Sequence, residues 1–183
     1  RLEGTVGARW AVRGVRLAGG EELPADLVRV GIGILPKADL VAGAGLPCRD
    51  GILVDRDART ADPRIFACGD CARRPLVHYG RDSRLESVHN AIEQGKLAAA
   101  AILARKRPPE EAPWFWSDQY DLKLQIAGLS EGHDTLLVRG DPAERKFAAF
   151  YLKHGRIIAV DAVNAAPEFL ATKRLIVSAA QVD

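Results

Sequence analysis

Apolar and polar residues alternate over short stretches in the first part of the chain, a pattern typical of β-strands with one exposed face. It predicts four strands, at residues 12–17, 27–33, 52–55 and 65–68. Gly19-Gly20 supplies a turn between the first two strands, and the last one ends at Gly69-Asp70. Because this meander has no strand, glycine loop and helix ahead of it, we expect the chain to be a fragment of a longer protein.

The pattern changes after this meander. Charged residues, proline and glycine dominate residues 71–84, which predicts a loop facing solvent. A helix is predicted next, because Ser87 or Asn90 can cap it and apolar or small residues follow at helical spacing. The positive run 105–107 suits the end of this helix, and Pro108-Pro109 prevents its continuation.

The last third of the chain predicts a small antiparallel sheet with a helix on one face. Its strand candidates are residues 122–126, 136–138, 147–152 and 157–163. His154-Gly155 marks a tight turn between the last two, and residues 167–180 form an amphipathic helix. The whole chain is therefore expected to combine an α/β part with a separate α+β part.

Composition narrows the function classes. With 183 residues, 48% of them apolar, the chain can bury a sizeable core. A formal net charge of +2 with both signs abundant gives no reason to expect nucleic-acid binding, and no stretch approaches the roughly 20 apolar residues that cross a membrane. The three cysteines are too few for a disulfide framework, so we expect a cytoplasmic protein.

One glycine pattern imitates a dinucleotide-binding loop. Gly31 and Gly33 follow a predicted strand, and Asp55 comes about twenty residues later. Pro36 stands where the third glycine should be, and no long helix follows to direct its N-terminus at a pyrophosphate. We interpret this pattern as a strand end.

Cys68 and Cys71 have the spacing of a redox pair. Asp70 between them disfavours a thiolate, and the first cysteine is not expected at a helix N-terminus. A zinc site would have to borrow His78 and His89, because the sequence offers no second cysteine pair. The hypotheses of a redox pair and of a zinc site are both weaker than a third interpretation, in which the cysteines are two small residues that flank a functional aspartate. We therefore expect no metal site.

That aspartate lies in a motif. Residues 59–72, with Gly69-Asp70 near their end, resemble the second flavin motif of flavoprotein reductases with two dinucleotide-binding domains. Physically, a glycine permits close approach of the backbone, and a carboxylate can accept hydrogen bonds from ribityl hydroxyls.

Two further motifs are similar to those of a narrower group, the ferredoxin, putidaredoxin and rubredoxin reductases of bacterial oxygenase systems. They are residues 84–91 and the Trp-Phe-Trp-Ser-Asp-Gln run within residues 112–119. The resemblance continues through 124–129 and 155–164, so it covers essentially the whole chain. Members of this group carry two glycine-rich motifs in an N-terminal half that this chain does not contain.

The resemblance implies three parts. Residues 1–28 would end an NAD(P)-binding domain, residues 29–107 would form the second segment of a split FAD-binding domain, and residues 108–183 would form a C-terminal interface domain. Alone, the chain is expected to bind FAD weakly or not at all and to be inactive, because most of the groups that hold the cofactor's phosphates are missing.

The resemblance also implies site residues. Gly69 and Asp70 would hold the ribityl chain of FAD. A helix N-terminus after Glu86, Ser87 and Val88 would direct backbone amides at the flavin N1 and C2 carbonyl. Trp116 would lie beside the isoalloxazine, whereas Trp114 is interpreted as a core residue. No acid–base catalytic residue is expected in this segment.

The implied activity is electron transfer from NAD(P)H through FAD to a ferredoxin or rubredoxin-type iron–sulfur protein. The partner ferredoxins of the family are acidic, so Arg73, Arg74, Arg81 and the 105–107 cluster are candidate docking charges, although a solvated face explains them equally well. Two alternatives stay open. One is a related flavoprotein with another acceptor, such as a nitrite or disulfide reductase, and the other is a non-enzymatic interaction module.

Overall fold

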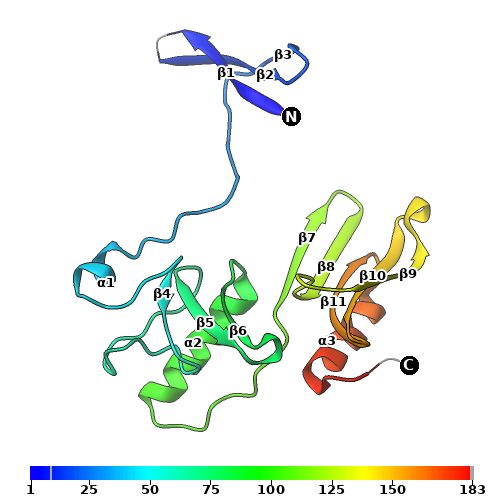
Figure 1. Ribbon diagram of the computed structural model, residues 1–183. Helices are drawn as coiled ribbons and strands as arrows, with labels where there is room; N and C mark the ends of the chain where they lie inside the picture. The colour runs from blue at the N-terminus through cyan, green and yellow to red at the C-terminus, as the bar shows by residue number, and fades with distance from the viewer. Residues whose placement is uncertain (9, 182–183) are drawn as a thin grey trace. The chain divides into compact units, whose positions relative to one another are not determined.

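The structure is a computed structural model that describes residues 1–8 and 10–181 (Figure 1). The chain divides into two compact units, Arg1–Leu35 and Pro36–Asp183. Among the described residues, no helix is both long and apolar enough to cross a membrane.

The first unit is a three-stranded antiparallel sheet in the order β1-β2-β3. Its strands are β1 (Leu2–Ala8), β2 (Ala11–Leu17) and β3 (Glu22–Pro24). The strand predicted at 12–17 is confirmed as β2, and Gly20 takes a positive φ of 83° in the turn that follows it. The strand predicted at 27–33 is wrong. Leu27 and Ile32 are 86% and 92% exposed, so their apolar side chains have no packing within the unit that would fix a strand there.

The second unit begins with short elements around a three-stranded sheet, β4-β5-β6. They are α1 (Asp39–Gly43), β4 (Ile52–Leu53), β5 (Ala72–Leu76), the 3₁₀ turn η1 (Val77–Tyr79), β6 (Arg81–Arg84) and α2 (Val88–Ile102). β4 is parallel to β5, and β5 is antiparallel to β6. The predicted helix is confirmed as α2, which begins after Ser87.

Two predictions in this region are wrong. Residues 65–68 form only an isolated bridge, between Phe66 and Arg59, and the loop predicted at 71–84 contains the antiparallel pair β5 and β6. β5 alternates buried and half-buried positions, and one of its inward residues is Arg74, which is 3% exposed. Because an arginine occupies one of the inward positions, the sequence does not show the alternation of apolar and polar residues by which a strand is recognised.

The rest of the second unit is a five-stranded antiparallel sheet in the order β7-β8-β11-β10-β9. Its strands are β7 (Trp114–Gln119), β8 (Leu122–Gly128), β9 (Thr135–Asp141), β10 (Lys146–Lys153) and β11 (Arg156–Val163), with the turn η2 (Pro142–Glu144) between β9 and β10. The helix α3 (Ala166–Ser178) follows. The four predicted strands, the turn at His154-Gly155 and the final helix are confirmed, and β7 is an additional edge strand.

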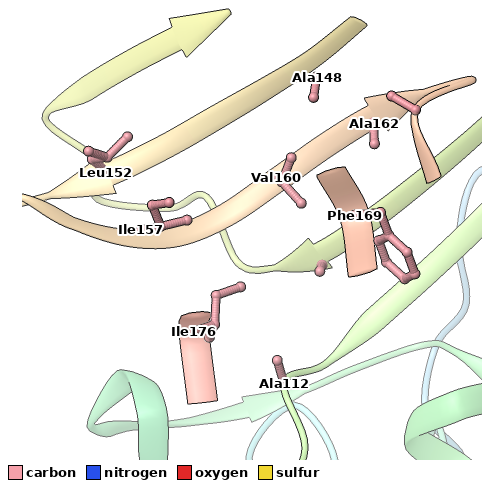
Figure 2. Close-up of a cluster of buried hydrophobic side chains, with 10 residues drawn as sticks. Ala112, Ala148, Leu152, Ile157, Val160, Ala162, Phe169 and Ile176 are labelled. Carbon is pink, nitrogen blue, oxygen red and sulfur yellow. The ribbon is translucent and has the colours of Figure 1, made fainter. Parts of the chain in front are cut away.

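The core of this sheet lies under α3. Figure 2 shows Phe169 and Ile176 of the helix packed with Val160 of β11 and Leu152 of β10, all buried. Burial of one such side chain contributes roughly 1.5–3 kcal/mol. The sheet therefore has a stable centre of its own, and its first strand, β7, is held at the edge through β8.

Candidate functional site

The N-terminus of α2 is the first element of the candidate site. Ser87 is its N-cap residue, with extended backbone angles, and the Ser87 hydroxyl accepts a hydrogen bond of 3.2 Å from the amide of Asn90. The amides of Val88 and His89, which precede Asn90, donate no such bond to the cap and have no acceptor inside the helix. With the side chain of Val88 58% exposed, this helix end can bind a negatively charged group.

The Gly69-Asp70 turn is the second element. Gly69 has φ of +82°, a conformation that favours glycine, and its amide donates to the Gln94 side chain at 2.9 Å. The Asp70 backbone carbonyl accepts a 3.0 Å hydrogen bond from Arg84, while the residue as a whole is exposed. The turn is thus fixed through its backbone, which leaves the carboxylate available to a ligand.

Two buried amides connect this turn to α2. Gln94 is 0% and Asn90 1% exposed, and the Gln94 amide donates to Asn90 at 3.2 Å. Asn90 in turn donates to the backbone carbonyl of Leu85 at 2.8 Å. Buried amides of this kind are stable only when hydrogen-bonded, so the chain of bonds fixes Gly69 and Leu85 to one helix.

Aromatic side chains of β7 form the third element. Trp114 is half-buried and contacts the core residue Phe169 at a ring distance of 5.8 Å, which confirms its interpretation as a core residue. Phe115 and Trp116 are 43% and 40% exposed, and the Trp116 ring lies 5.3 Å from that of Trp114. The outer end of this stack is therefore open to a planar ligand.

A hollow of about 230 Å³ lies beside the helix end and β7. Its lining includes Glu86 and Ser87 from the helix end and Trp114 and Phe115 from β7. The other predicted residues, Gly69, Asp70, Val88 and Trp116, do not line it. Trp116 packs on Trp114, which lines the hollow, and the Asp70 carbonyl is linked to Glu86 through Arg84.

Tyr79 is a structural residue that the sequence did not reveal. Its hydroxyl donates to the Ile158 carbonyl at 2.8 Å and accepts from the Leu129 amide at 3.0 Å. Burial raises the pKa of Tyr79 to about 12, so it remains a hydrogen-bond donor at all ordinary pH values. Through these bonds η1 is joined to β11 and to the end of β8, beside the hollow.

His89 is a second residue that sequence reasoning did not place in the site. Its ring lies 5.2 Å from Trp114, and its Nε2 is 3.4 Å from a Glu111 carboxylate oxygen. Burial lowers the pKa of His89, and the charges of Glu93 and Glu111 oppose that effect. The first turn of α2 is thereby packed against the segment that leads into β7.

The cysteine pair has the character of ordinary thiols. Cys68 is exposed, and the Cys71 thiol donates to the Cys68 carbonyl at 3.5 Å. Burial raises the pKa of Cys71, which disfavours the thiolate needed for redox chemistry. Among residues 1–8 and 10–181, no three side chains of the metal-binding types gather into a site.

The candidate docking charges are mostly neutralised within the chain. Four of the six are paired: Arg73 with Asp50, Arg74 with Glu93, Arg81 with Glu131 and Arg107 with Asp57. The prediction is wrong for Arg74, because its side chain is buried in a 2.6 Å ion pair. In the described part of the chain, Arg105 and Lys106 are exposed and have no ion pair, so they are the remaining candidates from this set.

Comparison with family models assigns both halves of the chain. Residues 114–183 match the Reductase C-terminal model. Residues 3–95, more than half of the chain, match the model of the pyridine nucleotide-disulphide oxidoreductases. The chain belongs to the pyridine nucleotide-disulphide oxidoreductase family. The expected combination of a dinucleotide-domain segment with a separate C-terminal reductase domain is confirmed.

Curated relatives within this family are ferredoxin reductases. The chain is 49% identical to the probable ferredoxin reductase CtmF of Castellaniella defragrans, over 96% of the chain and 42% of that protein. It is 47% identical to the putidaredoxin reductase CamA of Pseudomonas putida, over 86% of the chain and 37% of that protein. The resemblance inferred from the motifs is confirmed, and the chain spans less than half the length of these relatives.

A solved structure gives the same assignment. The reductase in a covalent putidaredoxin reductase–putidaredoxin complex matches with a TM-score of 0.94 and 42% sequence identity. The match covers 100% of this chain and 44% of that one. Both units of this pyridine nucleotide-disulphide oxidoreductase segment therefore have counterparts in a known reductase.

Proposed function

We propose that this chain is part of an enzyme that transfers electrons from NAD(P)H through FAD to a ferredoxin or rubredoxin-type iron–sulfur protein in the cytoplasm. The similarity to CtmF and CamA supports this activity. In this proposal the chain has the three parts that the resemblance implies. Residues 1–28 end the NAD(P)-binding domain, residues 29–107 form the second segment of the FAD-binding domain, and residues 108–183 form the interface domain.

The residues present fit the ribityl and pyrimidine part of FAD. Asp70 offers an exposed carboxylate on a turn whose backbone is fixed, which suits hydrogen bonding to ribityl hydroxyls. Gly69 has only the Ala91 methyl near the position of an added Cβ, at 3.7 Å, so the backbone is accessible. The amides of Val88 and His89 suit the side of the ring where negative charge gathers on reduction.

When bound, FAD supplies the redox chemistry, accepting a hydride and releasing single electrons. The chain's own residues bind and orient it. In this proposal Glu86 and Ser87 form the wall of the hollow at the helix end, and Trp116 covers the ring and excludes water. The observation that carries the proposal is the fixed Gly69-Asp70 turn, linked through Gln94 and Asn90 to the open end of α2.

The activity is tested with the full-length protein reconstituted with FAD. NADH and NADPH are supplied separately, and reduction of an acidic ferredoxin and of a rubredoxin is followed by absorbance. The proposal requires flavin-dependent reduction of at least one of the two. Turnover with only a disulfide or nitrite acceptor would support the related flavoprotein class, and absence of bound flavin would support an interaction module.

Replacing Asp70 with Ala is expected to weaken FAD binding by the full-length protein by about 10- to 100-fold. Hydrogen bonds to a charged acceptor contribute roughly 1.5–3 kcal/mol, and each 1.4 kcal/mol is a factor of ten in the dissociation constant. Titration of the apoprotein with FAD, followed by flavin fluorescence, measures the change. Asp82→Ala is the matched control, because Asp82 is an exposed aspartate on β6 outside the proposed site. Equal affinities for the two variants would contradict the role of Asp70.

A further inference from the structure

Arg84, the last residue of β6, lies between the two segments that are proposed to contact the flavin. We propose that Arg84 is the positioning residue that sets the spacing between the Gly69-Asp70 turn and the N-terminus of α2, and so tunes the redox potential of the flavin. The inference rests on the proposed function, since it concerns how these segments are held toward FAD.

A single guanidinium nitrogen of Arg84 joins the two segments. Its Nη1 donates to the Asp70 backbone carbonyl at 3.0 Å and to the Glu86 carboxylate at 2.8 Å. Its Nε donates to the Asp50 carboxylate at 3.2 Å, which fixes the plane of the group. The side chain of Arg84 is only 11% exposed, whereas its carboxylate partners Glu86 and Asp50 are 38% and 58% exposed. The guanidinium is therefore held in place by charge-assisted bonds that solvent reaches from the carboxylate side.

The backbone makes room for this guanidinium. Gly51 has φ of +111°, and an added Cβ would lie 2.8 Å from Cδ of Arg84 and 2.8 Å from the Cys71 carbonyl oxygen. Only a glycine fits in this conformation and this space. The Arg84 side chain therefore occupies a path built by its neighbours and does not lie loosely on the surface.

The buried side-chain amides of Gln94 and Asn90 on α2 bond each segment to the helix, whereas Arg84 bonds the two segments to each other. Gln94 holds the amide of Gly69, and Asn90 holds the carbonyl of Leu85, so each segment is bonded to the helix. Only Arg84, of these three side chains, bonds the segments to each other. Without it, the Asp70 carbonyl and the Glu86 carboxylate would be neighbouring acceptors with no donor between them, and they would move apart.

That separation affects the two redox states unequally. Reduction places negative charge near N1 and the C2 carbonyl of a flavin, where the amides of Val88 and His89 are proposed to point. A shift of the turn against the helix end weakens these charge-dependent bonds more than it weakens neutral contacts. Loss of Arg84 should therefore loosen the reduced cofactor more than the oxidised one.

The test uses Arg84→Met in the full-length FAD-loaded protein, since Met keeps most of the side chain's volume and removes its donors. We expect the dissociation constant of oxidised FAD to rise about tenfold and that of reduced FAD to rise about 100-fold. Because the ratio of the two constants changes about tenfold, the midpoint potential of the two-electron couple becomes about 30 mV more negative. Arg73→Met is the matched control, because the Arg73 guanidinium also donates to the Asp50 carboxylate, while its other hydrogen bond goes to the Asp82 carbonyl on β6. This control should leave the dissociation constants of oxidised and reduced FAD within about twofold of those of the unsubstituted protein.

Several outcomes are decisive. An unchanged affinity and potential in the Arg84→Met protein would overturn the inference, as would equal changes in the Arg73→Met control. If the Arg84 variant is not recovered folded, Arg84→Gln is measured in the same way.

Amide exchange in the FAD-free protein adds an independent readout, with faster exchange expected at residues 69–71 and 85–88 only for the Arg84 variants. Should the unsubstituted protein bind no FAD at all, the proposed function fails, and that result is separate from any effect of Arg84.

Discussion

Replacing Arg74 with Met is expected to lower the free energy of unfolding of the second unit by about 4 kcal/mol. Arg74 is 3% exposed, and its guanidinium lies 2.6 Å from the Glu93 carboxylate, which is nearly as buried. The substitution leaves that carboxylate charged and without its cation in a region of low dielectric constant. The other Glu93 oxygen accepts from the Glu111 amide, so the damage extends to the segment leading into β7.

Urea unfolding followed by tryptophan fluorescence measures this loss, because urea is uncharged and does not screen the ion pair. The double variant Arg74→Met with Glu93→Leu should be more stable than Arg74→Met alone, since it removes the unpaired charge. Arg145→Met is the surface control. Arg145 pairs with Asp121 while both side chains are more than half exposed, and its loss should cost less than about 1 kcal/mol. A loss of that small size for Arg74→Met would contradict the prediction.

Replacing Gly128 with Ala is expected to destabilise the second unit by about 3 kcal/mol. Gly128 has φ of +78°, and an added Cβ would collide with the Ile158 carbonyl oxygen and lie 2.7 Å from the Tyr79 hydroxyl. Displacing backbone atoms costs free energy, because it distorts the hydrogen-bonded sheet. The steric overlap therefore adds to the conformational strain of an alanine at positive φ. The hydrogen bonds of Tyr79 would be displaced at the same time.

Gly132→Ala separates strain from collision. Gly132 has nearly the same φ, +83°, but only the flexible Lys153 amine lies near its added Cβ, at 3.5 Å. It should cost only about 1 kcal/mol, the strain component alone. Thermal and urea unfolding of both variants compare the two positions, and equal losses would show that the contacts around Tyr79 do not contribute.

The fold was predictable from the sequence where apolar residues are concentrated in one element. Strands β10 and β11 are runs of mostly apolar residues on either side of the turn at His154-Gly155, and α3 repeats apolar residues at helical spacing. β5 could not be recognised, because its inward position Arg74 is stabilised by Glu93, nineteen residues away along the chain. The strand expected at 27–33 failed for the opposite reason, since its apolar residues have no partner strand within their unit.

For the candidate site, the sequence supplied the residues that are proposed to contact FAD, but not the side chains that hold these residues in place. Asp70, Ser87 and Trp116 were identified from motifs. Their supports were not assigned a role. Arg84 lies inside the motif at residues 84–91 and Gln94 lies outside it, and neither shows its function in the sequence, because their partners are backbone groups and distant side chains. Such partners become visible only when the loops are placed in three dimensions.

The hydrogen bonds of Tyr79 place few demands on the amino acids of the C-terminal sheet. Both of its partners in the C-terminal sheet are main-chain groups, those of Leu129 and Ile158, which every amino acid except proline provides. Side chains around the junction can therefore drift during evolution without loosening it, provided that Gly128 is kept. A chimaera that joins residues 36–107 to the C-terminal sheet of a distant homologue should therefore retain the hydrogen bonds of Tyr79.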